Sequence, residues 1–345
     1  MPVQDPSVLT LSKVVASLGA LIASLMPLQP AFSAEDGKSV YLLGSSASMA
    51  GFVPPPGTYV SDINYIYRGD GSGAIAASRS FRGRGNVELN ADLAIEARVA
   101  ISVLTALWIS PRRVLGGHVG VGFLAPVGYQ EAAVDINART ALTLPNGNVL
   151  TAGRQARLAD ETYAFGDPLG TAFIGWHHGN WHWKVAGLVN IPIGAYDQTD
   201  LANMGFNRWA ADISGAATWL DRKKGHEISV TAGFTFNGEN PDTNYTTGTE
   251  FHVEAAVMQH LSPAFAVGIV GYHYQQVTGD SGAGATLGGF KGETTAVGPN
   301  ANYNFQLGAT PVSTSLRWLH EVDAKNRLKG DAAFLTVTIP LGATR

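Results

Sequence analysis

The stretch Gly225–Asn237 (GHEISVTAGFTFN) decides the fold of this chain, because polar and apolar residues alternate through it. Successive residues of a β-strand point to opposite faces, so this alternation predicts a strand with one apolar and one polar face. The apolar members are Ile228, Val230, Phe234 and Phe236. The polar members are Glu227, Ser229 and Thr231.

The same alternation recurs along the chain in segments long enough to cross a bilayer, which takes about 9–11 residues of a tilted strand. The segments number about twelve, an even count of the kind found in single-chain bacterial outer-membrane barrels. The expected strands are Thr58–Arg68, Asn90–Ile109, Leu115–Tyr129, Pro168–His178, Trp181–Ile191, Asn207–Leu220, Gly225–Asn237, Phe251–His260, Ala264–Gln276, Thr294–Gln306, Ala309–Glu321 and Gly330–Pro340.

The connections between these segments alternate between long and short. The long ones are Gly69–Leu89, Gln130–Asp167, Gly194–Phe206, Gly238–Gly248, Val277–Glu293 and Val322–Lys329. The short ones are Ser110–Val114, Gly179-Asn180, Asp221–Lys224, Leu261–Pro263 and Leu307-Gly308. Short periplasmic turns and long extracellular loops are typical of outer-membrane barrels, whereas a soluble β-sandwich has no reason to alternate in this way. The sequence therefore predicts an all-β, transmembrane, antiparallel up-and-down barrel with its apolar face to lipid and its polar face to the lumen.

The N-terminus predicts export from the cytoplasm. Val14–Met26 is an apolar run of the length of a secretory signal, and small residues, Ala31 and Ser33, follow it. We expect a signal peptide over residues 1–33, a periplasmic or plug segment over 34–56 and the barrel over 57–345. Within the second segment, Ser39–Met49 is expected to form a short helix. It either folds into the periplasmic mouth as a plug or lies outside the barrel as a tether.

Composition excludes several classes of function. Charged residues make up 14% of the chain, against about 25% in soluble proteins, and the net charge is −4. No basic stripe of the kind that binds nucleic acid is visible. The chain has no Cys, which excludes disulfides, thiolate zinc sites and a cysteine nucleophile.

Polar residues on the expected lumenal face are the candidates for lining a pore. They form either a charged constriction or a network of ion pairs that braces the wall, because charges inside a barrel need partners. Glu96, Arg98 and Lys184 are expected to help define the constriction. The full set is Asp62, Asp92, Glu96, Arg98, His118, His182, Lys184, Arg208, Asp212, Glu227, His252, Glu254, Asn300 and Asn302.

No metal, cofactor or catalytic residue is predicted. His177, His178 and His182 cluster around a tight turn, but neighbouring strand residues point to opposite faces and do not converge easily. The Gly-x-Ser-x-Gly motif of a nucleophile elbow is absent. A barrel esterase with a Ser–His pair on its outer wall is the enzymatic alternative.

Several stretches, in order along the chain, resemble one family. They are Gly51–Tyr59 (GFVPPPGTY), Phe165–Pro168 (FGDP), Ile191–Tyr196 (IPIGAY), Asn244–Gly248 (NYTTG), Val267–Gln276 (VGIVGYHYQQ), Gly279-Asp280 and Val297–Pro299 (VGP). The chain resembles the outer-membrane proteins linked to meta-cleavage (MetA) pathways of phenol degradation, often called transporters. The resemblance implies a barrel channel in the bacterial outer membrane, with membrane lipid and small hydrophobic or aromatic solutes as its partners. A structural or adhesive barrel whose long loop Gln130–Asp167 binds surfaces is the alternative.

Overall fold

The computed structural model describes residues 35–81, 85–144, 146–285, 288–289 and 291–343. The predicted signal peptide, residues 1–33, lies outside the described residues. No helix in the described ranges is long and apolar enough to cross a membrane.

The described residues form a 12-strand closed antiparallel barrel, which confirms the expected fold class. Closure comes from β1, which pairs with β2 on one side and with β15 on the other. The strands are β1 (Gly57–Phe81), β2 (Gly85–Val114), β3 (Gly117–Thr143), β4 (Val149–Phe165), β5 (Leu169–His178), β6 (Trp181–Asn190), β7 (Ala210–Asp221), β8 (His226–Asn237), β11 (Glu250–His260), β12 (Phe265–Gln276), β13 (Glu293–Leu307), β14 (Thr310–Lys325) and β15 (Lys329–Ala343). The short strands β9 (Glu239–Asn240) and β10 (Tyr245–Thr246) pair with each other beside the barrel.

One barrel position is shared by β4 and β5, which both pair with β3. The break between them is Gly166-Asp167-Pro168, and the Asp167 carboxylate replaces the missing ladder contacts. It accepts hydrogen bonds from the backbone N–H groups of Gly194 (2.7 Å) and Phe206 (2.8 Å) and from the Asn190 amide (2.9 Å). The buried Asp167 therefore ties the interrupted wall to the connection between β6 and β7.

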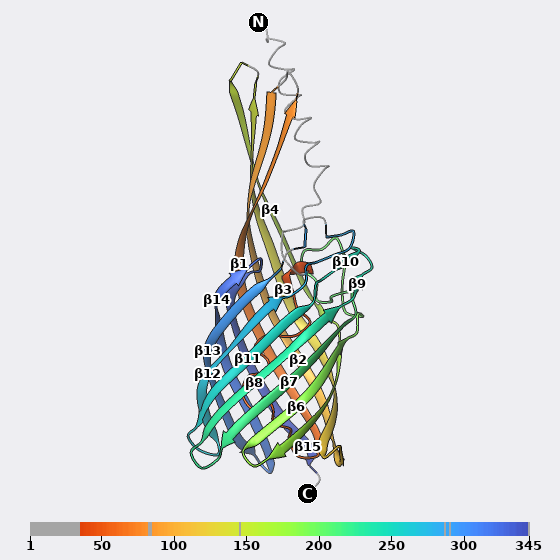
Figure 1. The fold of residues 1–345 in the computed structure, drawn as a ribbon, viewed down its shortest axis with the longest axis vertical. Coiled ribbons are helices and arrows are strands. Elements are labelled where there is room, and N and C mark those ends of the chain that lie inside the picture. Colours follow the sequence, from red (N-terminus) through yellow and green to blue (C-terminus); the bar gives the residue numbers. More distant parts are fainter. Residues whose placement is uncertain (1–34, 82–84, 145, 286–287, 290, 344–345) are drawn as a thin grey trace. The chain divides into compact units, whose positions relative to one another are not determined.

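Two of the expected long loops are strands. β1 to β4 continue past the ends of the other strands as a four-stranded extension (Figure 1). Residues 69–81 and 85–89 and most of Gln130–Asp167 are therefore paired sheet. Asp92, for example, faces Ala74 on β1 and Asn137 on β3. The expectation of loops was wrong here, because the strand ladder does not stop at the level where the rest of the barrel ends.

The short turns lie at the opposite end, the lower end in Figure 1. The turn between β2 and β3 is Leu115-Gly116, and both residues have positive φ, 49° and 78°. Such a pair fits a two-residue hairpin turn, in which the backbone twist matches that of the flanking strands. We call this end of the barrel the short-turn end and the other the long-connection end.

The two faces of the barrel are inverted relative to a soluble protein. Ile213 is 59% exposed and Val257 62% exposed on the outer face, whereas Glu227 and Glu254 on the inner face are 0% and 1% exposed. In β8, the alternation of the deciding stretch is confirmed, because its polar residues are buried and its apolar residues are exposed. An apolar outer band and a polar interior are the arrangement that a lipid environment requires.

Candidate functional site

The N-terminal segment, residues 38–56, lies against the inner wall of the barrel. It has turns and no helix, so the expected short helix over Ser39–Met49 is not formed; only a 3-10 turn, η1 (Glu35–Gly37), precedes it. Several backbone N–H groups of this segment instead donate hydrogen bonds to side chains of the wall. These bonds take the place of the hydrogen bonds that a helix would supply.

Two buried carboxylates bind this backbone. Glu254 of β11 accepts the N–H groups of Gly44 and Ser46, both at 2.8 Å. Glu227 of β8 accepts the N–H of Met49 at 2.6 Å. Charge-assisted hydrogen bonds of this kind are about twice as strong as neutral ones. The middle of the segment is therefore fixed to the wall formed by β8 and β11.

The segment also contacts both ends of the barrel. At the long-connection end, Glu35, in the 3-10 turn just before the segment, accepts hydrogen bonds from the Asn240 amide (2.9 Å) and the Thr243 hydroxyl (2.6 Å). At the short-turn end, the N–H of Gly51 donates to the Thr218 hydroxyl (3.0 Å). A Cβ at Gly51 would lie 2.4 Å from the His182 carbonyl oxygen, so only glycine allows this approach.

An apolar cavity of about 310 Å³ lies between the first part of this segment and the remaining wall. Its lining on the barrel side comes mainly from β1, β2 and β3, and on the other side from residues 37–45. The apolar wall residues are Ile63, Val99, Ile101, Val103, Leu124, Pro126, Leu169 and Leu188. A largely apolar cavity with a few polar groups is typical of small-molecule sites.

Toward the short-turn end, the N-terminal segment packs against the wall in an apolar cluster. Val53, Tyr59 and Ile109 are buried together, and Leu107 and Phe173 pack against them. The Tyr59 hydroxyl donates to the carbonyl oxygen of Pro55 at 2.8 Å, which ties the three consecutive prolines to β1. This cluster lies inside the lumen toward the short-turn end, which is the periplasmic end in outer-membrane barrels.

Ten of the fourteen candidate pore residues face the lumen. Most of them bind the N-terminal segment or one another: the Asn302 amide donates to Ser48, and His252 pairs with Asp212 at 2.8 Å. These ten are His118, His182, Lys184, Arg208, Asp212, Glu227, His252, Glu254, Asn300 and Asn302. Their role in conduction stays a prediction.

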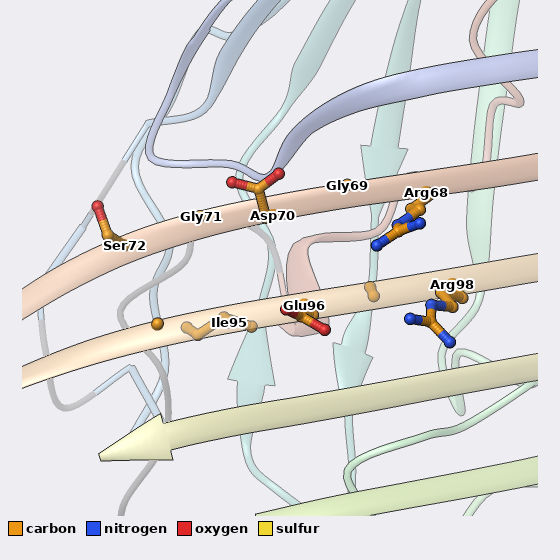
Figure 2. Close-up of a pocket in the computed structure, with 10 residues that line it drawn as sticks. Arg68, Gly69, Asp70, Gly71, Ser72, Ile95, Glu96 and Arg98 are labelled. Atoms are coloured by element: carbon orange, nitrogen blue, oxygen red, sulfur yellow. The ribbon is translucent and has the colours of Figure 1, made fainter. Parts of the chain in front are cut away.

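The other four candidates, Asp62, Asp92, Glu96 and Arg98, lie on the face of β1 and β2 that points away from the lumen. This differs from the expectation. Glu96 and Arg98 line an outer depression together with Arg68 and Asp70 at the root of the extension (Figure 2), and Arg98 pairs with Glu131 of β3. The residues that alternate with them, including Val99, line the cavity.

The reversal has a physical cause. Alternation shows only that the two faces of a strand differ, and the expectation that the polar face points to the lumen holds where the lumen is polar. On this side the lumen is an apolar cavity, so the apolar face of β2 turns inward. The sequence pattern alone does not distinguish an apolar cavity from lipid.

Further lumenal residues were not foreseen. Tyr41, Glu250, Arg317, Glu321 and Arg327 all face the lumen or its cavity. Glu250 lies two residues before His252 and so continues the alternation of His252 and Glu254. The alternation therefore predicts its lumenal position, although Glu250 lies one residue before the expected strand. Tyr41 and Arg327 lie outside the strands and carried no periodic signal.

The histidines meet differently from the expectation. His177 and His182 are cross-strand partners, and their Nδ1 atoms lie 2.6 Å apart in the lumen, next to the ring of Phe52. The argument that neighbouring residues diverge holds for His177 and His178, but not for a pair on adjacent strands. No group of three or more His, Asp or Glu among the described residues is placed to hold a metal ion.

Comparison with known proteins gives one family. Residues 76–337 match the model of the family described as "Putative MetA-pathway of phenol degradation". No curated protein matches the chain by sequence.

Among solved structures, an outer membrane channel from Pseudomonas putida F1 is similar, with a TM-score of 0.60 and 15% identity over 87% of this chain and 99% of that chain. This likeness shows a shared fold. A FadL homologue from Pseudomonas aeruginosa aligns with a TM-score of 0.36 and 12% identity over 91% of this chain and 100% of that chain.

Proposed function

Because the chain belongs to the family described as "Putative MetA-pathway of phenol degradation", we propose that it is an outer-membrane channel for small hydrophobic or aromatic compounds. The proposal assigns it no enzymatic activity and no cofactor.

Residence in the outer membrane is supported by the closed barrel and its exposed apolar band. Large apolar side chains such as Ile213, Val257 and Ile269 face outward in the middle of their strands. Exposing them to water would cost about 25 cal/mol per Å² of apolar surface, whereas lipid removes this cost. A closed barrel leaves no strand edge unpaired in hydrocarbon.

The observation that carries the transport proposal is the apolar cavity inside the lumen. A water-filled pore for ions would have polar walls, but Val99, Ile101 and Val103 present a continuous apolar surface. A single-ring aromatic compound fits a cavity of this size and loses its contact with water there. The solute then reaches the periplasm only when the segment around Val53 moves away from Tyr59 and Ile109.

Uptake of radiolabelled toluene by cells with an intact lipopolysaccharide leaflet tests this proposal. Cells that make the barrel should take it up several-fold faster than cells with an empty vector. Ile101→Trp fills the cavity and should abolish the gain, whereas Val121→Trp, on the outer face, should keep it. Equal uptake with and without the barrel would contradict the proposal.

A structural or adhesive barrel is the second candidate, and the four-stranded extension of β1–β4 favours it. Shortening the extension by removing residues 72–95 and 134–159 separates the two functions. A channel should keep its uptake after this change. An adhesive protein should lose surface attachment of the cells and show no uptake before or after it.

A further inference from the structure

Two side chains that line the cavity carry buried hydrogen-bond donors without an acceptor. The Tyr41 hydroxyl and the Arg327 Nη1 atom have no hydrogen-bond partner among the residues that the structure describes. Both residues line the largely apolar cavity. A buried donor without a partner is unfavourable in a native structure, so each such group needs an explanation.

The two donors rest on a pair of neighbouring side chains of the wall. The Tyr41 ring stacks on His252 of β11, with ring centroids 3.6 Å apart and an angle of 14°. The Arg327 guanidinium lies over the ring of Tyr274 of β12, 4.2 Å from its centroid. His252 and Tyr274 are directly opposite each other in the antiparallel ladder. Side chains of such a pair are neighbours on one face of the sheet.

These supports are themselves fixed by hydrogen bonds. His252 Nε2 lies 2.8 Å from the Asp212 carboxylate, and the Tyr274 hydroxyl donates to Glu250 at 2.6 Å. The supports therefore hold both donors in a defined position at one side of the cavity before any solute binds. Preorganised polar groups in an apolar pocket are what orients a small ligand.

The charges nearby select for a neutral solute. Burial, together with the carboxylates of Glu254 and Asp212, raises the pKa of the Tyr41 phenol well above its ordinary value, so it stays a neutral donor. The positive charge of Arg327 is balanced by the nearby carboxylates of Glu250 and Glu321. An anionic solute would meet these four carboxylates, whereas a neutral oxygen gains the hydrogen bonds without that repulsion.

We infer that Tyr41 and Arg327 form a polar subsite that binds the oxygen atom of neutral oxygenated aromatics, such as phenols, while the apolar wall of the cavity holds the ring. This inference rests on the proposed function and adds to it a preference within the class of aromatic solutes. Arg327 and Tyr41 donate hydrogen bonds to the solute oxygen, which a plain hydrocarbon of the same size lacks. The subsite therefore discriminates phenol from toluene.

Calorimetric titration of the detergent-solubilised full-length protein, with an empty-micelle blank, tests the subsite. A hydrogen bond to a charged group is worth enough that phenol should bind about tenfold more tightly than toluene. Arg327→Met and Tyr41→Phe should each weaken phenol several-fold and change toluene by no more than about twofold. Arg68→Met and Tyr303→Phe, on the outer face, are the matched controls and should change neither affinity.

Three results would overturn the inference. They are equal affinities of the unaltered protein for phenol and toluene, an equal weakening of both solutes in the two variants, and tighter binding of benzoate than of phenol. Each leaves the proposed function standing as long as toluene still binds. Absence of binding of any of these aromatics would contradict the proposed function itself. A heat-dependent shift in gel mobility confirms in each variant that the barrel is folded.

Discussion

The Glu254 carboxylate accepts a hydrogen bond of 2.8 Å from the backbone N–H of Gly44, although the two residues are 210 positions apart in the chain. This contact joins the N-terminal segment to β11 inside the barrel. The Arg317 guanidinium of β14 donates a hydrogen bond to the carbonyl oxygen of the same residue, Gly44. These two hydrogen bonds hold the segment inside the lumen.

Replacing Glu254 should loosen this segment. In Glu254→Ala the N–H groups of Gly44 and Ser46 lose their acceptor inside the barrel, at a cost of about 2 kcal/mol or more in the free energy of unfolding. Single-channel conductance in planar bilayers should rise, and the urea midpoint should fall. Glu161→Ala, on the exposed part of β4, is the control. Unchanged conductance in Glu254→Ala would show that the segment does not restrict the pore.

Gly51 offers a test at the short-turn end. In Gly51→Ala the new Cβ would lie 2.4 Å from the His182 carbonyl oxygen and 2.7 Å from the Thr218 nitrogen, so the segment must shift. We expect a loss of about 1–3 kcal/mol in stability and a more frequently open channel. Gly170→Ala is the matched control, because nothing lies within 4 Å of its Cβ. Equal open probabilities in the two variants would contradict a gate at this position.

The charges of Glu96 and Arg98 should have little effect on ion preference. Both face away from the lumen, whereas Lys184 faces it, with its Nζ 5.8 Å from the Phe173 ring centroid. Reversal potentials in a salt gradient should stay the same in Glu96→Gln and Arg98→Gln. In Lys184→Gln they should shift toward cation preference. A shift in the first two variants would place the conducting path on the outer depression.

Asp167 should be important for stability and not for solute choice. Asp167→Ala removes the acceptor of three donors, from Gly194, Phe206 and Asn190, and should lower the free energy of unfolding by about 3 kcal/mol. Unfolding in urea, followed by loss of the heat-dependent gel shift, measures this effect. Asp135→Ala, an exposed partner of Arg157, should change stability little. Equal midpoints would mean that the break between β4 and β5 tolerates the loss.

Sequence alternation identified the strands because that information is local. In Gly225–Asn237 each residue has a neighbour of opposite polarity, and the resulting strand places Glu227 inside and Ile228 outside, as expected. Every one of the expected segments coincides with a strand of the barrel. Hydrogen bonding between neighbouring strands then follows from the need to pair every backbone group in lipid.

Which face of β2 points inward was decided only by the tertiary structure. Val99, Ile101 and Val103 meet an apolar cavity, and Glu96 and Arg98 meet the outside, because the N-terminal segment occupies the polar side of the lumen and leaves an apolar space opposite. The sequence of a strand with one apolar face does not show whether that face meets lipid or an apolar cavity, since both environments exclude water. The sequence by itself determined where the strands are and that they close into a barrel. What each side of the lumen can bind was decided by the path of residues 38–56 through it. That path depends on contacts between residues more than 160 positions apart in the chain, which no local pattern of the sequence reveals.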